Sequence, residues 1–162
     1  MADVLKGDAM NGIIKAICIA EVAGAPMREV QMVEAVAGVG LAGDRYAKAE
    51  GSFNRGRLGK NQVTLMNTIF FEGTEFAFTD SRRNLFVEGT ELMWLIGRDF
   101  QIGTARFRGV KYCDPCQRPS KLSGKTRSFK EAFLDRGGLR ADVLESGTIR
   151  VGDVLIPPPK GY

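Results

Sequence analysis

Two cysteines three positions apart, Cys113 and Cys116, are the residues of this sequence best suited to chemistry. Positive charge near a thiol favours the thiolate, the form that attacks sulfur or binds a soft metal. Pro115 has no N–H and a fixed φ, so it should end a strand between the two thiols. The stretch predicts a reactive site; a buried structural role is the alternative, because cysteine is often a core residue. The basic residues around the pair are Arg106, Arg108, Lys111 and Arg118.

A C-x-x-C pair serves several chemistries. Structural zinc needs four nitrogen or sulfur ligands, and the sequence has three cysteines and no histidine. We therefore expect no zinc within one chain, while a zinc shared across a dimer stays open. A thioredoxin-type pair should begin a helix, and the Gln-Arg-Pro that follows Cys116 is a poor helix start. The pattern favours a lone nucleophilic or metal-ligating thiolate with the other thiol as an accessory.

Two other stretches are candidates for binding an anion. Closely spaced glycines lead to Gly43, Asp44 and Arg45, and glycines let backbone N–H groups approach a ligand. The spacing fits neither a dinucleotide fingerprint nor a P-loop, and Asp44 bonding local backbone is the structural alternative. The Arg-Arg-Asn at 82–84 supplies Arg83 and Asn84. Guanidinium groups suit phosphate, although paired arginines are often plain surface charge.

Composition places the chain among ordinary globular proteins. It has 162 residues, of which 44% are hydrophobic and 26% charged, enough for one domain with a sizeable core. No apolar run has the length of a membrane span, and no secretory signal pattern is recognisable. The odd cysteine count suits a reducing cytosol, so we expect a cytoplasmic protein. The net charge of +4 is spread along the chain, so we expect no nucleic-acid partner and no membrane partner.

Short strands separated by glycine turns dominate the pattern. Cys18 lies in the first apolar run, and we expect it to fill the core. Short helices are expected at 67–78 and 128–136, and residues 47–60 read as a long surface loop, a lid or binding loop. Strands are expected at 13–20, 27–36, 62–66, 85–87, 105–112, 139–143 and 149–156, with short strands or turns at 92–96 and 99–102.

This pattern predicts a mainly-β fold with two or three short helices, in which a closed or partly closed barrel protects the strand edges. No internal repeat or linker divides the sequence. We therefore expect one domain over 13–157, a peripheral N-terminal segment over 1–12 and a tail over 158–162.

Taken together, these stretches resemble the MOSC domain family, the domains related to the C-terminal part of molybdenum cofactor sulfurase. The resemblance runs from about residue 13 to residue 156. Its pieces are Gly-Leu-Ala-Gly-Asp-Arg-Tyr at 40–46, Arg-Arg-Asn at 82–84, the basic strand ending in Cys-Asp-Pro-Cys at 113–116, and Ile-Arg-Val-Gly-Asp-Val at 149–154.

The resemblance implies a small stand-alone MOSC-like β-barrel with a cysteine that carries sulfur or ligates molybdenum in the pterin cofactor. The family motif puts that cysteine at Cys116 and makes Cys113 an accessory thiol. It also puts Arg83 and Asn84 near the pterin phosphate. We expect neither the pyridoxal-phosphate domain nor the second barrel domain of larger members, so sulfur or electrons must come from a partner.

Three functions follow from these observations. In the first, Cys116 takes sulfur from a cysteine desulfurase or another persulfide donor and passes it to an acceptor such as a molybdoenzyme, and Cys113 resolves the persulfide as a disulfide. In the second, the protein is a molybdenum-cofactor oxidoreductase with Cys116 as the metal ligand and a redox partner. The third is a binding domain without chemistry. The cofactor-binding candidates are Gly43, Asp44, Arg45, Arg83, Asn84, Arg108, Lys111 and Arg118.

Overall fold

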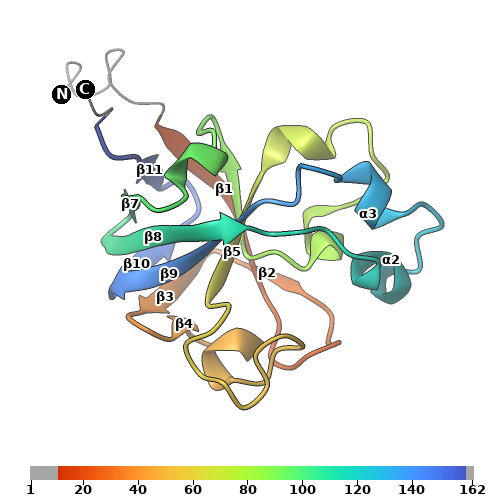
Figure 1. Cartoon of the computed structure of the whole chain (residues 1–162), viewed down its shortest axis with the longest axis horizontal. Helices are drawn as coiled ribbons and strands as arrows, with labels where there is room; N and C mark the ends of the chain where they lie inside the picture. Colours follow the sequence, from red (N-terminus) through yellow and green to blue (C-terminus); the bar gives the residue numbers. More distant parts are fainter. Residues whose placement is uncertain (1–10, 160–162) are drawn as a thin grey trace.

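Seven strands close into a barrel in the computed structural model, which describes residues 11–159 (Figure 1). Because β1 pairs with both β6 and β11, none of the seven has a free edge, which confirms the predicted mainly-β barrel. Around the barrel the strands are β11 (Val154–Ile156), β7 (Asp99–Ile102), β8 (Ala105–Tyr112), β9 (Leu139–Glu145), β5 (Val63–Asn67), β6 (Leu85–Glu88) and β1 (Gly12–Ile19).

Shorter elements surround the barrel. β2 (Arg28–Val30) extends the sheet beyond β1, and β10 (Gly147–Arg150), β3 (Met32–Val36) and β4 (Gly40–Leu41) form a second sheet. Two short helices, α2 (Arg118–Ser123) and α3 (Phe129–Ala132), lie together at one side (Figure 1). The 3-10 turns are η1 (Arg45–Lys48), η2 (Thr68–Phe71), η3 (Phe78–Ser81) and η4 (Met93–Leu95).

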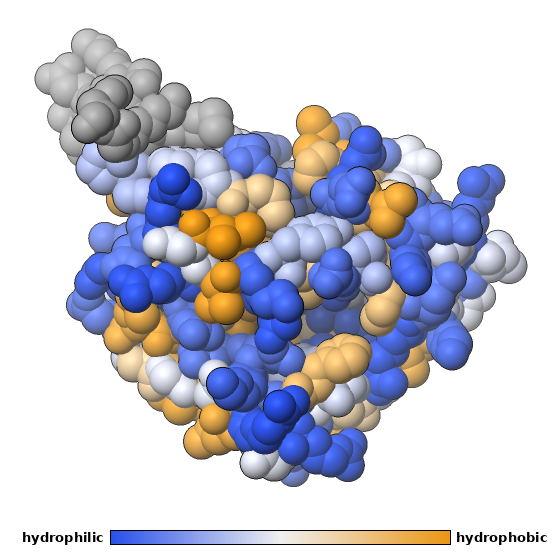
Figure 2. All heavy atoms as spheres, in the orientation of Figure 1, coloured by the Kyte–Doolittle hydropathy of each residue, from blue (hydrophilic) through white to orange (hydrophobic). Residues whose placement is uncertain are grey.

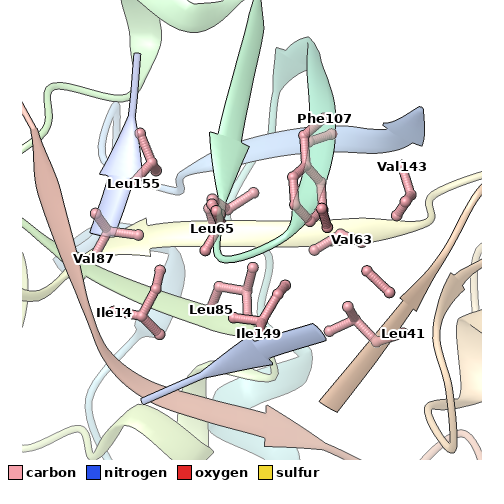
Figure 3. Close-up of a cluster of buried hydrophobic side chains, with 14 of the residues drawn as sticks. Ile14, Leu41, Val63, Leu65, Leu85, Val87, Phe107, Val143, Ile149 and Leu155 are labelled. Carbon is pink, nitrogen blue, oxygen red and sulfur yellow. The ribbon is translucent and has the colours of Figure 1, made fainter. Parts of the chain in front are cut away.

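Apolar side chains fill the barrel. Alternate residues of each strand point inward, as the period of a β-strand requires, and Figure 3 shows side chains from β1, β5, β6 and β8 meeting there. Polar side chains cover most of the outer face drawn in Figure 2, with small apolar groups between them. Among the inward residues are Ile14, Val63, Leu65, Leu85, Val87, Phe107, Val143, Ile149 and Leu155.

A second apolar cluster lies on the outside of β1 and β6. Its centre is aromatic: Phe86 of β6 packs with Phe71 at a ring-centroid distance of 5.7 Å, and Phe129 stacks on Phe133 at 4.4 Å. Cys18 is fully buried in this cluster, which confirms it as a core residue. From Ala16 to Ile19, β1 is therefore buried on both faces, and this part of its sequence is continuously apolar, whereas Ile13 and Lys15 are exposed.

The helix expected at 67–78 was wrong. Only η2 and η3 form there, and Gly73 separates them at a φ of 79°. Asn67 does not cap a helix. Its amide donates hydrogen bonds to the carbonyls of Val87 and Thr90, at 3.4 and 2.6 Å. The segment serves instead as the crossover between β5 and β6, the one parallel pair among the described strand pairings.

Three further boundaries differ from the sequence-based expectations. The strand expected at 149–156 is two strands, because Gly152 turns the chain at a φ of 95°. The strand expected at 27–36 divides at Gln31 between the two sheets. The Gln-Arg-Pro at 117–119 does start a helix, α2, because proline is tolerated in the first helical turn, where N–H groups have no helical partner.

The expected terminal segments mostly lie outside the described residues. Residues 1–10 of the expected peripheral segment and residues 160–162 of the expected tail are not described, and Gly12 already belongs to β1. Ser128 caps α3 by accepting a hydrogen bond from the Glu131 N–H at 3.1 Å, but the helix ends at Ala132, earlier than expected. In the described part of the chain no helix has the length and apolarity needed to cross a bilayer.

The burial of Cys18 leads to a prediction about thiol reactivity. Burial raises the pKa of the Cys18 thiol to about 12, and the charge of Glu29 adds to this. In mildly alkaline buffer, iodoacetamide should modify the half-buried Cys113 and Cys116 of the native protein and reach Cys18 only after unfolding in denaturant. Peptide mass spectrometry measures this. Equal modification of all three thiols in the native protein would contradict the described core.

Candidate functional site

A cavity of about 300 Å³ opens where the chain leaves β8. Both Cys113 and Cys116 line it, together with residues from η1, the loop before β5, the entrance to β6, the start of α2 and β9. The structure therefore brings the two candidate thiols into one cavity with segments from distant parts of the sequence. The lining residues are Arg45, Tyr46, Ser52, Phe53, Asn61, Thr64, Arg82, Arg83, Tyr112, Cys113, Asp114, Pro115, Cys116, Arg118, Pro119 and Arg140.

Backbone hydrogen bonds and one buried arginine hold the turn that carries the thiols. The Cys113 N–H donates to the Gly138 carbonyl at 2.9 Å. The Arg83 guanidinium donates through Nε to the Gly137 carbonyl at 2.9 Å and through Nη2 to the Asp114 carbonyl at 3.3 Å. Because Arg83 is only 7% exposed, these bonds are shielded from water, and they fix the turn against the strand that follows it.

Gly137 makes this contact possible. A Cβ at residue 137 would overlap the Cys113 carbonyl oxygen and lie 2.9 Å from the Pro115 ring. The Gly137 N–H also donates to the Tyr112 hydroxyl at 3.2 Å. The two chain segments therefore approach each other as closely as backbone allows.

Five guanidinium groups line the cavity, and their own partners leave part of their hydrogen-bonding capacity free. Arg45 pairs with the buried Asp44 at 2.9 Å and donates to the Arg82 carbonyl at 3.2 Å. Arg82 donates to the Ala25 carbonyl at 2.6 Å. Among the described residues, no carboxylate lies within ion-pair distance of Arg82, Arg83, Arg118 or Arg140.

The crowding of like charges affects Arg82 most. Burial lowers its pKa to about 10, and the neighbouring charges of Arg45 and Arg118 contribute in the same direction. Burial also raises the pKa of Tyr46, whose ring lies 4.7 Å from the Arg45 guanidinium carbon, while that positive charge partly opposes the shift. A site with this excess of positive charge is stabilised by an anion.

Two of the arginines that line the cavity each have one buried nitrogen without a hydrogen-bond partner: Nη2 of Arg82 and Nε of Arg140. A buried N–H without an acceptor costs roughly 1–3 kcal/mol. The guanidinium groups that line the cavity suit an oxyanion such as phosphate. Among the described residues, no three His, Cys, Asp or Glu side chains gather to hold a metal ion.

Of the three basic cofactor-binding candidates nearest the thiols in sequence, only one lines the cavity. Arg118 lines the cavity, whereas Arg108 and Lys111 are exposed and do not. Arg108 pairs with Asp99 at 2.7 Å across β7 and β8. Their nearness to the thiols in sequence is therefore not nearness in the cavity.

Among the other anion-binding candidates, the side chains of Asn84 and Asp44 form hydrogen bonds to the backbone, and Gly43 lies outside the cavity. Asn84 is buried, accepts from the Thr64 N–H at 3.1 Å and donates to the Cys18 carbonyl at 3.0 Å, so its side chain links β5, β6 and β1. Asp44 accepts from the Ala20 N–H at 3.1 Å. Gly43, at a φ of 88°, is exposed and does not line the cavity.

Sequence reasoning missed Arg140, Asn61 and Thr64 as lining residues. Arg140 lies on β9 beside Lys111 of β8 and Thr64 of β5 in the strand register. In the sequence it is one polar residue of an alternating strand. Only the pairing of three strands reveals its place, and no local signal carries that information.

A MOSC domain model matches residues 46–156, which is more than half of the chain. The chain belongs to the MOSC domain family. The match starts at Tyr46, so most of the glycine-rich stretch at 38–46 precedes it. The matched range of this MOSC domain contains both thiols that line the cavity and four of the five cavity arginines.

Solved structures share the fold of this MOSC domain. The YuaD protein of Bacillus subtilis has a TM-score of 0.74 and 15% identity, with 94% of this chain and 98% of that chain covered. YiiM from Geobacillus stearothermophilus has a TM-score of 0.65 at 15% identity, covering 93% of this chain and 77% of that one. YiiM from Escherichia coli has 0.63 at 13%, covering 93% and 71%. No curated protein matches in sequence.

The close approach at Gly137 leads to a second prediction. Gly137→Ala should push the Cys113 carbonyl away, weaken the Arg83 bond and destabilise the protein by about 1–3 kcal/mol, as overpacking does. The alkylation rates of Cys113 and Cys116 should change with it. Denaturant unfolding and timed alkylation measure the two effects.

Gly124→Ala is the matched control. It meets open space but has a φ of 72°, so it should cost about 1 kcal/mol from backbone strain alone and leave both thiol rates unchanged. If Gly137→Ala behaves in the same way as Gly124→Ala, the described contact does not position the thiols.

Proposed function

We propose that this MOSC domain carries sulfur as a persulfide on Cys116 and binds an anionic ligand, the phosphate of the molybdenum-cofactor pterin, with the guanidinium groups beside it. The observation that supports this is the shared cavity: two accessible thiols and five guanidinium groups line one space of about 300 Å³. Membership of a family associated with molybdenum cofactor sulfurase-like domains agrees with it.

The sulfur step is an exchange between thiols. The Cys116 thiolate attacks the outer sulfur of a donor persulfide, R–S–SH. The new bond joins Cys116 Sγ to that sulfur, the donor S–S bond breaks, and the donor leaves as the thiolate R–S⁻. The outer sulfur keeps its proton, so the product is Cys116–S–SH and no external oxidant or reductant is needed. A nearby positive charge favours both the attacking thiolate and an anionic acceptor.

The other residues have distinct roles in this proposal. Arg83 positions the thiol turn, because its guanidinium is bonded to the Gly137 and Asp114 carbonyls. Arg82, Arg118 and Arg140 would hold the phosphate, because no carboxylate pairs with them among the described residues. Cys113 lies in the same cavity as the accessory thiol. The donor would be a protein persulfide such as that of a cysteine desulfurase, and the acceptor a molybdoenzyme.

A molybdenum-cofactor oxidoreductase is the second candidate, and the same observation favours it. Cys116 lines the same cavity as the guanidinium groups that would hold a cofactor phosphate, and a thiolate is a suitable ligand for a soft metal. When bound, the cofactor would supply a redox-active molybdenum centre. Molybdenum content separates the two candidates: stoichiometric metal that is lost in Cys116→Ala favours the oxidoreductase.

Persulfide formation tests the first candidate. After incubation with a cysteine desulfurase and cysteine, a tryptic peptide with Cys116 should gain about 32 Da, one sulfur atom. Cys113→Ser should still gain it and Cys116→Ser should not. A wild-type protein that gains no sulfur on Cys116 rules out the proposal that Cys116 carries sulfur. Sulfur found on Cys113 alone would show that Cys113, and not Cys116, is the thiol that carries it.

Anion binding gives a separate prediction. Phosphate should raise the melting temperature, because a ligand that binds only the folded state stabilises it, by about 2.7 kcal/mol at 100 times its Kd. Arg118→Met should weaken phosphate binding roughly tenfold. Without phosphate, the variant should melt slightly higher than the wild type, because it removes a charge that repels Arg82.

Arg108→Met is the matched control, since Arg108 lies outside the cavity and pairs with Asp99. It should leave the phosphate response unchanged. Equal loss of the response in both variants would show that phosphate binds through general surface charge and not in the cavity.

A further inference from the structure

A second cavity, of about 870 Å³, lies between η2 and the end of β6, and its described lining residues all differ from those of the thiol cavity. The two cavities lie toward opposite ends of β5, because Thr64 near the start of that strand lines the thiol cavity and Asn67 at its end lines the second. Three segments form the second cavity: Lys15 of β1, residues 67–72 with Phe78, and residues 87–91. We call it the β5–β6 groove.

Apolar side chains form one part of this groove. Ile69 is 64% exposed, the most exposed of the large apolar side chains in the described part of the chain. Phe70 and Phe78 line the same groove and are half-buried. η2, the yellow turn at the upper edge of Figure 1, leaves apolar groups on the surface at the same place in Figure 2. A ligand that covers these side chains would remove apolar surface from water, which is favourable.

Carboxylates form the other part of the lining. Glu72 follows η2, and Glu88 and Glu91 lie at and just after the end of β6; all three are exposed. Lys15 is the one cation among the described lining residues. Within residues 11–159, no lysine or arginine lies within ion-pair distance of any of these three carboxylates. The groove is therefore locally negative in a chain whose net charge is +4.

Contacts around the groove agree with this charge. Glu91 is held in place by accepting hydrogen bonds from the N–H groups of Met93 and Trp94, at 3.0 and 3.1 Å. The guanidinium carbon of Arg136 lies 5.3 Å from the centre of the Phe70 ring, so this ring is already in contact with a cation. If Arg136 is counted with Lys15, the three carboxylates still outnumber the cations around the groove.

The apolar and acidic parts together describe one kind of ligand. It must present an apolar side chain to Ile69 and Phe70 and positive charge to the carboxylates. Nucleic acids and anionic lipid surfaces are repelled by the carboxylates. A protein segment with an apolar residue between lysines or arginines meets both conditions, and a volume of about 870 Å³ accommodates a few side chains and not a folded domain.

We propose that the β5–β6 groove is a docking site for a basic segment of a partner protein, anchored by an apolar side chain. The proposal goes beyond the sulfur-carrier function, because the residues that line the groove are all outside the thiol cavity. Recognition combines burial of the apolar anchor with charge complementarity at the rim. The first term gives affinity and the second gives specificity and a dependence on salt.

Fluorescence anisotropy of labelled peptides with the whole protein tests the proposal. The probes are Lys-Leu-Lys-Leu-Lys, its analogue Lys-Gln-Lys-Gln-Lys and the charge-reversed Glu-Leu-Glu-Leu-Glu. At low salt, the wild type should bind the lysine–leucine peptide roughly tenfold more tightly than the lysine–glutamine peptide, because the leucines are buried on binding. Added salt should weaken the lysine–leucine peptide. The glutamate peptide can bind the arginines of the thiol cavity, so Ile69→Ser should not alter its affinity.

Ile69→Ser removes the exposed part of the apolar wall. It should weaken the lysine–leucine peptide roughly tenfold. Leu58→Ser is the matched control, because Leu58 is 59% exposed and lines neither cavity. This control should leave the affinity unchanged. A melting temperature within a few degrees of wild type shows that both variants are folded.

A charge swap separates recognition from structural damage. Glu72→Lys combined with Glu88→Lys should weaken the lysine–leucine peptide roughly tenfold and strengthen the glutamate peptide. Loss of folding cannot exchange one preference for the other. Glu21→Lys combined with Glu29→Lys changes the net charge equally, at exposed residues outside the groove. This control should change both affinities much less.

Several outcomes overturn the proposal. These are a wild type that does not prefer the lysine–leucine peptide, an Ile69→Ser variant that binds it as tightly as Leu58→Ser does, and two double variants with the same affinities. Binding to phosphatidylcholine vesicles that Ile69→Ser abolishes would assign the groove to a membrane surface. Self-association in sedimentation that Ile69→Ser abolishes would assign it to a second copy of this chain. Because no persulfide takes part, these results are independent of sulfur transfer to Cys116.

Discussion

The site depends on the bonds by which Arg83 ties the thiol turn to the barrel. Its guanidinium reaches from the entrance of β6 to carbonyls on both sides of the turn, those of Asp114 and Gly137. Arg83 thus uses its nitrogens to position Cys113 and Cys116, while its neighbour Arg82 has one buried nitrogen without a partner. The two consecutive arginines therefore have different partners: Arg83 donates to the Gly137 and Asp114 carbonyls, and Arg82 donates to the Ala25 carbonyl.

The cavity also shows how a binding site opposes stability. Burial lowers the pKa of Arg82, and the neighbouring charges of Arg45 and Arg118 add to this, so burial and like-charge repulsion both oppose the charged form of Arg82 in the folded protein. A sequence selected only for stability would place a carboxylate or an apolar group there. Local conflicts of this kind gather at functional sites, which is consistent with the cavity, and not the ion pairs on β7 and β8, being the working surface.

Much of the fold could be predicted from the sequence, because strand alternation and glycine turns are local signals. The barrel, the core position of Cys18 and the two thiols following β8 were all accessible in this way. The arginines that line the cavity were harder to predict from the sequence. Arg108 is close to the thiols in sequence but pairs with Asp99, whereas Arg140 enters the cavity through strand register. Strand register depends on pairing between segments that are distant in sequence, so the local pattern of one sequence does not reveal it.

The closing pair of the barrel, β1 with β11, joins the first and last described strands of the chain. The family match begins at Tyr46, after β1. The shared sequence pattern therefore covers six of the seven barrel strands and omits β1, the strand that completes the ring. Loop-closure entropy must be overcome before such a distant pairing forms. The ring is complete, and the apolar interior sealed from solvent, only when the first described strand of the chain pairs with the last.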